Sequence, residues 1–364
     1  MGFADRFPIS APVARKSAAD RAALLQDLKF GREFTDHMAR AVYTNGEGWH
    51  SQELVGYGPL SLSPATSVFH YAQEVFEGLK AYRHADGSVW AFRPERNAER
   101  FQRSARRLAM AELPVEDFLG SIEALVAADR EWVPSDPDSS LYLRPFAFGS
   151  EPYLGVHPSN EITYLLIASP VGPYFATGFS PVSIWVTREY NRAAPGGTGA
   201  AKTGGNYASS MLPTNEAYAH GCQQVCFLDA ATDTLLEELG GMNVMVVMDD
   251  GTVATPRLSG TILEGVTRDS VLTLLREGGS AVQERDIPMT ELLDGVRSGR
   301  IREVFACGTA AVITPIGRLA AHDFDVTVGD GTPGEVTTSL YNHLTDIQFG
   351  RAEDAHGWLY PLVR

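Results

Sequence analysis

The chain has 364 residues, of which 44% are hydrophobic and 21% charged, and its formal net charge at pH 7 is −15. This is an ordinary globular composition, long enough for two domains with separate cores. The strong negative charge disfavours nucleic acid or an anionic membrane as a partner.

Targeting and redox signals are weak in this sequence. No apolar stretch reaches the length of a membrane span, and the N-terminus lacks the apolar core of a signal peptide. The three cysteines, Cys222, Cys226 and Cys307, form neither a disulfide framework nor a metal-binding motif. We therefore expect a cytoplasmic protein with reduced thiols and no metal site.

The first part of the chain mixes short strands with helices. Residues 1 to about 40 are expected to form an arm with polar and helical pieces. The sequence His84-Ala-Asp-Gly87 predicts a hairpin. Pro94 opens a helix that continues through residues 96–110, and a second helix is expected after Pro114 over residues 116–132. The expected strands are residues 79–82, 89–92, 140–148 and 162–168.

Residues 169–182 are rich in proline, glycine and serine and mark the clearest domain boundary. We expect a small N-terminal α/β domain over residues 1–170, a linker over residues 171–182, and a large C-terminal domain over residues 183–364 that carries Lys202. Beyond the linker we expect one helix over 206–220 and another within 261–277, with Gly265 near the start of the second. A hairpin is expected to turn at Asp250-Gly251. The expected strands are residues 183–188, 224–229, 235–238, 302–307 and 312–315. Strands and helices follow no regular βαβ rhythm, so the fold class is α/β or mixed α+β in two domains.

Lysine is scarce in this chain. Only Lys16, Lys29, Lys80 and Lys202 occur, whereas the other 26 basic residues are arginine. Lys202 lies in a glycine-rich stretch, residues 196–207. Arginine cannot replace a lysine that must lose its proton and attack a carbonyl, because guanidinium stays charged. Lys202 is therefore the first candidate for covalent chemistry, and a lysine that forms a Schiff base is characteristic of pyridoxal phosphate enzymes.

The same stretch offers a second interpretation, a phosphate-binding P-loop. The sequence GGTGAAKT at residues 196–203 resembles GxxxxGK[ST], but Ala201 stands where the second glycine is required. A P-loop also runs directly into a helix, and Gly204-Gly205 disfavours an immediate helix here. A P-loop nucleotide-binding protein is thus a disfavoured alternative, and a non-catalytic binding module is a third.

A pyridoxal phosphate site needs an acid for the ring nitrogen, a donor to the phenolate oxygen, and a cup for the phosphate. Glu238 stands at a strand end before two glycines, and Tyr207 lies five residues after Lys202. The small-residue turns at 265–267 and 308–310 offer amides and hydroxyls for a phosphate, and Arg100 would add a bidentate charge. The sequence thus contains a candidate for each group that the chemistry requires.

These residues lie in blocks that resemble the branched-chain amino acid aminotransferases. The blocks, in family order, are VFEGLKAY (75–82), FRPERNAERF (92–101), LYLRPFAFG (141–149), YNRAAPGGTGAAKTGGNYASS (190–210), EELGGMN (237–243), LEGVTRD (263–269) and CGTAAVITP (307–315). The same class of pyridoxal phosphate enzymes includes D-amino acid aminotransferase and aminodeoxychorismate lyase, which remain the nearest alternatives. The paired blocks at 75–82 and 141–149, with the long central block, favour the branched-chain enzyme.

The resemblance implies a two-domain pyridoxal phosphate enzyme of fold type IV, similar to D-amino acid aminotransferase, with the cofactor between the domains. Lys202 would form the Schiff base and shuttle the substrate proton. Glu238, rather than Glu237, would pair with the pyridine nitrogen, and Tyr207 would donate to the phenolate oxygen. The phosphate would be held by Arg100, Val266, Thr267 and Thr309.

The resemblance also implies the substrates. They are leucine, isoleucine or valine with 2-oxoglutarate, giving branched 2-oxo acids and glutamate in a reversible reaction. Arg144 would recognise the distal carboxylate of glutamate. The remaining pocket residues would be Tyr71, Phe76, Tyr142, Tyr174, Ala310 and Ala311. In this family a neighbouring subunit completes the pocket, so a homodimer with shared active sites is expected.

One departure from the family pattern is informative. Mammalian members carry a Cys-x-x-Cys redox pair just after the Gly-Thr-Ala turn, and here those positions are Ala311 and Thr314. We therefore expect no such switch, and we expect Cys307 to be a buried strand thiol.

Overall fold

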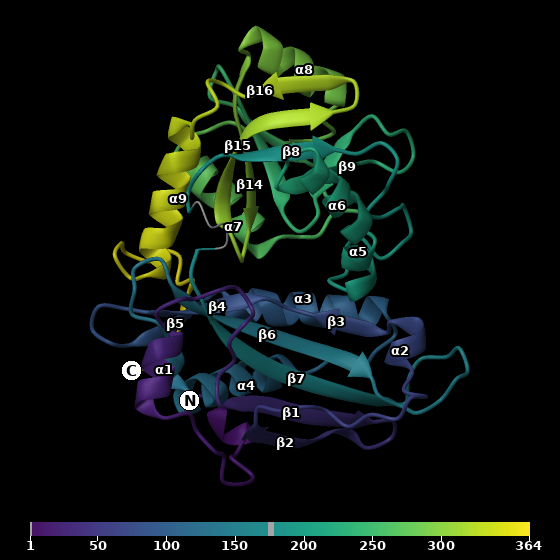
Figure 1. Cartoon of the computed structure of the whole chain (residues 1–364), viewed down its shortest axis with the longest axis vertical. Coiled ribbons are helices and arrows are strands. Elements are labelled where there is room, and N and C mark those ends of the chain that lie inside the picture. The colour runs from purple at the N-terminus through teal and green to yellow at the C-terminus, as the bar shows by residue number, and fades with distance from the viewer. Residues whose placement is uncertain (1, 174–177) are drawn as a thin grey trace. The chain divides into compact units, whose positions relative to one another are not determined.

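The computed structural model describes residues 2–173 and 178–364 (Figure 1). The chain forms two compact units. Unit 1 consists of Met1–Tyr174, Ala201–Gly204 and Asp346–Arg364, and unit 2 of Phe175–Ala200 and Gly205–Thr345. The segments 201–204 and 346–364 therefore group with unit 1, whereas the sequence led us to expect them in the C-terminal domain. That these units are the two domains of the fold stays a prediction.

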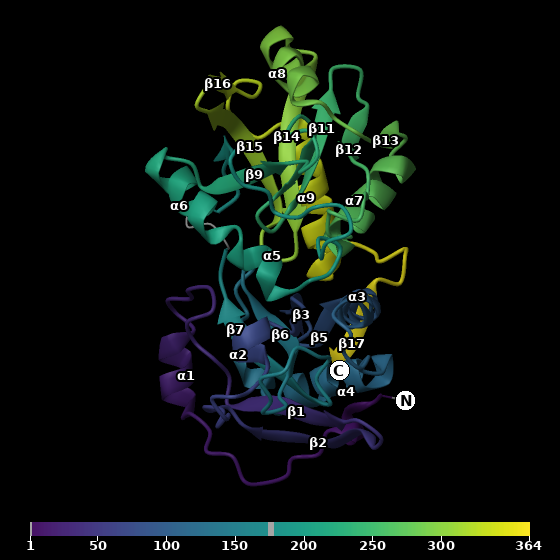
Figure 2. The ribbon, with the colours of Figure 1, turned by 90° about the vertical axis from the view of Figure 1, so that its right-hand side faces the viewer.

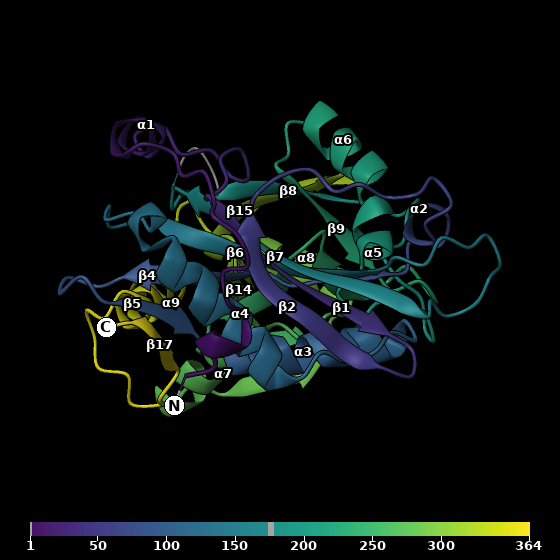
Figure 3. The ribbon, with the colours of Figure 1, turned by 90° about the horizontal axis from the view of Figure 1, so that it is seen from below.

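Unit 1 is built on one antiparallel sheet. Its strands are β1 (His37–Thr44), β2 (Gly48–Gly56), β3 (Glu74–Phe76), β4 (Leu79–Arg83), β5 (Val89–Phe92), β6 (Ser140–Gly149), β7 (Glu161–Val171) and β17 (Leu359–Val363). They pair in the order β17-β5-β4-β6-β7-β1-β2, with β3 paired to β6. Figure 3 shows β6, β7, β1 and β2 side by side.

The helices of unit 1 complete its core. They are η1 (Ala4–Arg6), α1 (Ala18–Leu24), α2 (Val68–Tyr71), α3 (Pro94–Arg107), α4 (Val115–Ala128) and η2 (Arg130–Trp132). The ring of Phe101 in α3 lies 5.6 Å from that of Phe118 in α4 and 5.9 Å from that of Tyr164 in β7. All three side chains are buried, and each contributes about 1.5–3 kcal/mol of hydrophobic stabilisation. This core holds α3 against the sheet, which matters for the site below.

Unit 2 contains a mixed sheet that closes on itself. Its strands are β8 (Val182–Val186), β9 (Gln224–Leu228), β10 (Leu236–Leu239), β11 (Asn243–Met248), β12 (Val253–Pro256), β13 (Val282–Arg285), β14 (Ile301–Gly308), β15 (Val312–Ala321) and β16 (Phe324–Thr327). They follow the order β10-β9-β8-β15-β14-β11-β12-β13, and β16 pairs with β15 (Figure 2). Because β10 also pairs with β11, the strands from β10 to β11 form a closed ring.

The helices of unit 2 are α5 (Gly204–Ala208), α6 (Met211–Ala219), α7 (Val266–Glu277), α8 (Met289–Ser298) and α9 (Glu335–Gln348). The first residue of α5 and the last three of α9 belong to unit 1. Alternate residues of the ring strands, such as Val244, Val246, Val304 and Ala306, share a hydrophobic core with Leu292 of α8. This period of two is what a strand with one buried face produces.

The structure confirms the mixed α/β class and most of the expected strands, with several corrections. The helix expected over 206–220 is two helices, α5 and α6. Gly204-Gly205 does not exclude a helix after Lys202, since α5 begins at Gly204. The helix expected over 116–132 ends at Ala128, and the one expected within 261–277 begins at Val266, with Gly265 as its N-cap. None of the helices in the described part of the chain combines the length and apolar character of a membrane span.

Candidate active site

The backbone around Lys202 is fixed by hydrogen bonds within unit 1. The Lys202 N–H donates to Ser104 Oγ of α3 at 2.9 Å, and its carbonyl accepts from the Phe76 N–H of β3 at 3.0 Å. The next residue, Thr203, donates its hydroxyl to the Glu74 carbonyl at 2.7 Å. A side chain that starts from so constrained a backbone reaches a defined place, which a reactive amine requires.

Ser104 connects this segment to helix α3. Its hydroxyl is fully buried and donates to the carbonyl of Arg100 at 2.9 Å while it accepts from Lys202. One side chain therefore links the backbones of two predicted site residues. Ser104 is not predictable as a site residue from the sequence, because a serine within a helix is a common structural feature.

The Lys202 amine lies beside an aromatic cluster of the same unit. Its Nζ is 4.7 Å from the centre of the Phe76 ring, and Arg144 Cζ is 4.8 Å from that ring and 5.3 Å from the ring of Tyr142. Arg144 Nη2 donates to the Tyr142 hydroxyl at 2.9 Å. A Cβ at Gly78 would overlap with that hydroxyl, so a larger residue there would displace the Tyr142 side chain. The structure thus brings together four of the predicted residues: Phe76, Tyr142, Arg144 and Lys202.

Arg144 retains hydrogen-bonding capacity in this cluster. Its Nε is buried and has no hydrogen-bond partner within the described part of the chain. A buried guanidinium N–H without an acceptor costs free energy, which an anionic ligand would recover. This is the property expected of a residue that recognises a carboxylate.

Arg100 makes a buried ion pair that the sequence analysis did not predict. Its Nε and Nη2 donate to the two carboxylate oxygens of Glu77 at 2.7 and 2.8 Å, and the two side chains are 5% and 0% exposed. Burial opposes ionisation of Glu77, but the charge and hydrogen bonds of Arg100 outweigh it and lower the pKa of the carboxyl. The pair fixes the guanidinium plane, as bidentate pairs do.

Two further residues of unit 1 have distinct surroundings. Tyr71 ends α2 and is 39% exposed, and its hydroxyl donates to the backbone carbonyl of Leu154. Lys80 on β4 is buried, and burial lowers its pKa to about 8. Lys80 thus has a larger neutral fraction than an exposed lysine, and nothing in the sequence singled it out. Tyr174 lies outside the described residues.

In unit 2, Glu238 on β10 accepts two strong hydrogen bonds. Arg192 Nη1 lies 2.6 Å from Glu238 Oε1, with the side chains 1% and 3% exposed, and the Leu263 N–H donates to the same oxygen at 3.0 Å. Both contacts thus converge on one carboxylate oxygen of Glu238. Arg192 was missed at the sequence level, although it stands in the most specific family block.

The adjacent Glu237 differs from Glu238 in its surroundings. It accepts a hydrogen bond from the Thr261 hydroxyl, and burial raises the pKa of its carboxyl. Successive residues of a strand point to opposite faces, so only one of the two can serve a given site. The buried ion pair with Arg192 distinguishes Glu238 from Glu237.

Strand pairing brings the start of α7 and the end of β14 to Glu238. Glu238 is opposite Asn243, which is opposite Cys307 on the next strand. Asn243 Nδ2 donates to the Leu263 carbonyl at 3.0 Å, and a side chain at Gly265 would overlap with Asn243 Oδ1. Gly265 is the N-cap of α7, so Val266 and Thr267 supply the first helical amides, which attract anions.

The turn after β14 contains the remaining predicted residues. Thr309, Ala310 and Ala311 form this turn and are half-buried. A Cβ at Gly308 would lie 3.4 Å from the Gly241 carbonyl, and one at Gly241 would lie 3.5 Å from the Tyr207 ring. Tyr207 and the 308–311 turn therefore flank the same short loop. Unit 2 thus groups Tyr207, Glu238, Val266, Thr267 and Thr309.

Cys307 is buried in β14, where burial raises its pKa to about 12. This confirms the expected buried strand thiol. All three cysteines are free.

These two groups of residues match the chemistry of pyridoxal phosphate. Unit 2 supplies a buried anion for a ring nitrogen, a phenol, and helix amides with a small-residue turn for a phosphate. Unit 1 supplies the amine, the fixed guanidinium of Arg100, and Arg144, whose buried Nε–H has no hydrogen-bond partner in the described residues. The donor set is that expected for the cofactor and for an amino acid substrate.

Comparison with known proteins assigns the family. The amino-transferase class IV family model matches residues 74–319. A branched-chain-amino-acid aminotransferase of Mycolicibacterium smegmatis is 52% identical over 360 residues, which cover 98% of each chain, and one of Mycobacterium tuberculosis is 51% identical over 361 residues, with the same coverage.

Solved structures agree with this assignment. The branched-chain amino acid aminotransferase of Escherichia coli superimposes with a TM-score of 0.72 at 28% identity, covering 89% of this chain and 99% of that one. The T.th. enzyme with pyridoxamine 5'-phosphate gives a TM-score of 0.74 at 28% identity and the same coverage. The T.th. enzyme has also been solved with N-(5'-phosphopyridoxyl)-L-glutamate, at a TM-score of 0.72, 28% identity and the same coverage.

Proposed function

Because the chain belongs to the branched-chain amino acid aminotransferases of the class IV family, we propose that Lys202 carries its transamination chemistry, with pyridoxal phosphate as cofactor. Its activity is branched-chain amino acid transamination. The proposal concerns the cofactor, the residue roles and the second substrate. Pyridoxamine phosphate and a phosphopyridoxyl-glutamate adduct in the T.th. enzyme support the cofactor and the use of glutamate.

Lys202 is the proposed base. When bound, pyridoxal phosphate supplies a carbonyl that condenses with amines and a ring that takes up electrons from the substrate Cα–H bond. The Lys202 amine would take that proton from Cα and deliver it to C4′ of the cofactor. Its fixed backbone at Ser104 and Phe76 keeps the amine in position between these two transfers.

Glu238, Tyr207 and the phosphate residues would orient the ring. Glu238, which forms an ion pair with Arg192, would keep a ring nitrogen protonated and so increase the electron demand of the ring. Tyr207 would donate to the phenolate oxygen. The phosphate would be bound by Arg100 and the amides and hydroxyls of Val266, Thr267 and Thr309, which are spread over a helix start and a turn.

The pocket residues of unit 1 account for two kinds of substrate. Phe76 and Tyr142 present apolar surface to a branched side chain, and burying such a side chain contributes about 1.5–3 kcal/mol. Arg144 would bind the distal carboxylate of glutamate or 2-oxoglutarate through its unpaired Nε–H. Tyr71, Tyr174, Ala310 and Ala311 are the other proposed pocket residues.

We further propose a homodimer with shared active sites and a cytoplasmic location. Unit 1 exposes large apolar side chains, including Phe69 at 60%, Leu154 at 61% and Val156 at 84%, which supports burial against another subunit. The three free cysteines support a reducing compartment.

The observation that carries this proposal is the fixed position of Lys202 beside the Phe76 ring, which Arg144 also contacts. It is tested by comparing L-leucine and D-alanine as donors to 2-oxoglutarate, in the wild-type enzyme and in Lys202→Arg. We expect leucine to be preferred and the variant to fold but lose transamination. Preference for D-alanine would support the D-amino acid aminotransferase alternative, and turnover in the variant would show that Lys202 is not the base.

A further inference from the structure

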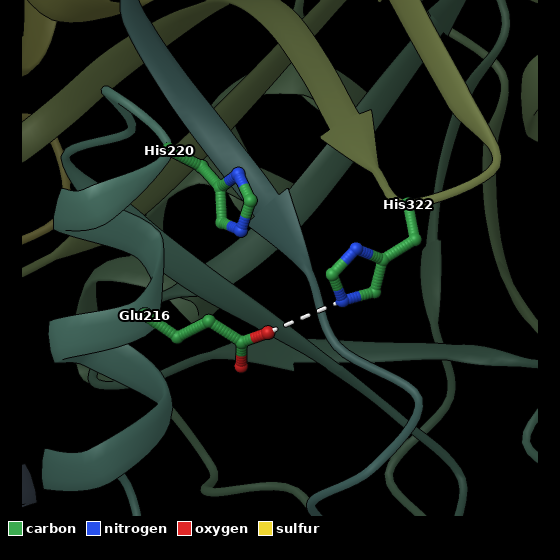
Figure 4. A group of neighbouring side chains, drawn as sticks. All are labelled: Glu216, His220 and His322. Atoms are coloured by element: carbon green, nitrogen blue, oxygen red, sulfur yellow. Dashed lines mark ion pairs between the residues drawn. The ribbon is translucent and has the colours of Figure 1, made fainter.

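Three metal-ligating side chains meet on unit 2, outside the proposed active-site residues. Glu216 lies on α6, His220 is the C-cap of that helix, and His322 lies in the turn between β15 and β16 (Figure 4). One ligand atom from each residue lies within 4.8 Å of the other two. Figure 4 shows the carboxylate of Glu216 directed toward the ring of His322, at 3.4 Å from its Nε2.

A buried tryptophan orients both imidazoles. The His220 ring stacks on Trp185 with centroids 3.8 Å apart and an interplanar angle of 2°. The His322 ring meets the same indole edge-on at 5.0 Å and 88°. Trp185 is only 3% exposed, so it is a rigid base for the two rings. Side chains held in this way lose little conformational entropy when they bind a ligand.

We propose that Glu216, His220 and His322 form a surface site for Zn²⁺. Two imidazoles and one carboxylate are a ligand set that zinc accepts, with water in the fourth position. Tetrahedral zinc places its ligand atoms about 3.3 Å apart, so small side-chain rotations from the present separation suffice. The imidazoles select zinc over calcium or magnesium, which prefer oxygen ligands.

The carboxylate of Glu216 has capacity for a further ligand. Its Oε2 is buried and has no hydrogen-bond partner in the described part of the chain. The ion pair with His322 uses only Oε1. A zinc ion would engage the carboxylate and both histidines, whereas the Glu216–His322 contact engages only one of them.

The site would join two parts of unit 2 that are distant in sequence. Glu216 and His220 are one helical turn apart, but His322 comes more than a hundred residues later. A bound ion would therefore fix the β15–β16 turn to the end of α6 and stabilise unit 2 by mass action. Because of this separation, no sequence motif indicates the cluster.

The test is a calorimetric titration of the tag-free, chelator-treated holoenzyme with Zn²⁺. We expect one Zn²⁺ per chain and a higher Tm in its presence. His220→Ala and His322→Ala should each weaken binding roughly 10-fold or more and abolish the Tm increase. Transaminase activity without zinc should be unchanged in both variants, which shows that they are folded.

His157→Ala is the matched control. His157 also lies near a glutamate, with Nε2 4.0 Å from Glu151 Oε1, but it is not part of the cluster. This variant should bind zinc like the wild type. Cu²⁺ should quench the Trp185 fluorescence, and Trp185→Phe should remove that component. Absence of zinc binding, or equal binding in His322→Ala and the wild type, would contradict the proposed site.

Discussion

Replacing Glu77 by glutamine should destabilise the protein strongly, because Glu77 is the buried partner of Arg100. Its carboxylate accepts from Arg100 Nε, Arg100 Nη2, Asn97 Nδ2 at 2.8 Å and the Gly78 N–H at 3.1 Å. Glutamine keeps the shape but turns one acceptor into a donor. It also leaves the guanidinium without a counter-charge at a site that is 0–5% exposed.

Removing one partner of a buried ion pair costs about 3–5 kcal/mol. At about 2–4 °C per kcal/mol, the Tm should fall by about 6–20 °C. The assay is thermal and urea unfolding of the holoenzyme, with Glu112→Gln as the matched control. Glu112 accepts hydrogen bonds from Nε and Nη2 of Arg106, a residue of α3 like Arg100, at 2.7 and 2.8 Å. This ion pair is exposed, so Glu112→Gln should unfold almost like the wild type.

The pH dependence gives an independent check. The pKa of Glu77 in the folded protein lies below its ordinary value of 4.5, so its charge stabilises the fold at higher pH. The stability difference between wild type and Glu77→Gln should be full above pH 4.5 and shrink as the pH falls through the lower, folded-state pKa. Equal unfolding of Glu77→Gln and Glu112→Gln would refute this reasoning.

Three other changes test separate parts of the site. Ser104→Ala leaves the Lys202 N–H without its acceptor, so the free energy of unfolding in urea should fall by about 1–3 kcal/mol. The kcat should fall as well. An unchanged kcat would show that Ser104 does not position Lys202. Arg144→Gln should raise KM for 2-oxoglutarate much more than KM for leucine in steady-state assays, and an equal rise would argue against carboxylate recognition. Cys307, whose pKa burial raises to about 12, should not react with a thiol reagent in the native enzyme at pH 8, and rapid labelling would contradict its burial.

The sequence was most informative where the chemistry requires one residue type that no other can replace. Lys202 stood out because arginine replaces lysine elsewhere in the chain. Gly265, expected near the start of α7, is its N-cap, where a Cβ would overlap with Asn243 Oδ1. The groups around Glu238 followed from the family blocks and were brought together by strand pairing in unit 2.

Residues that act through a partner were not predictable in the same way. Glu77, Ser104 and Arg192 are defined by contacts with residues far along the chain. Strands β1 and β2 were missed because their burial is mixed and gives no clear alternation. The break between α5 and α6 was missed because the apolar pattern of a sequence does not reveal where the hydrogen bonds of a helix are interrupted.

The most direct measurement is the identity of the lysine that binds the cofactor. The holoenzyme is reduced with borohydride and digested, and the pyridoxyl-modified peptide is sequenced by mass spectrometry. The account predicts modification of Lys202 alone among the four lysines. Modification of Lys80, the buried lysine with a pKa of about 8, or of no lysine, would contradict the central claim.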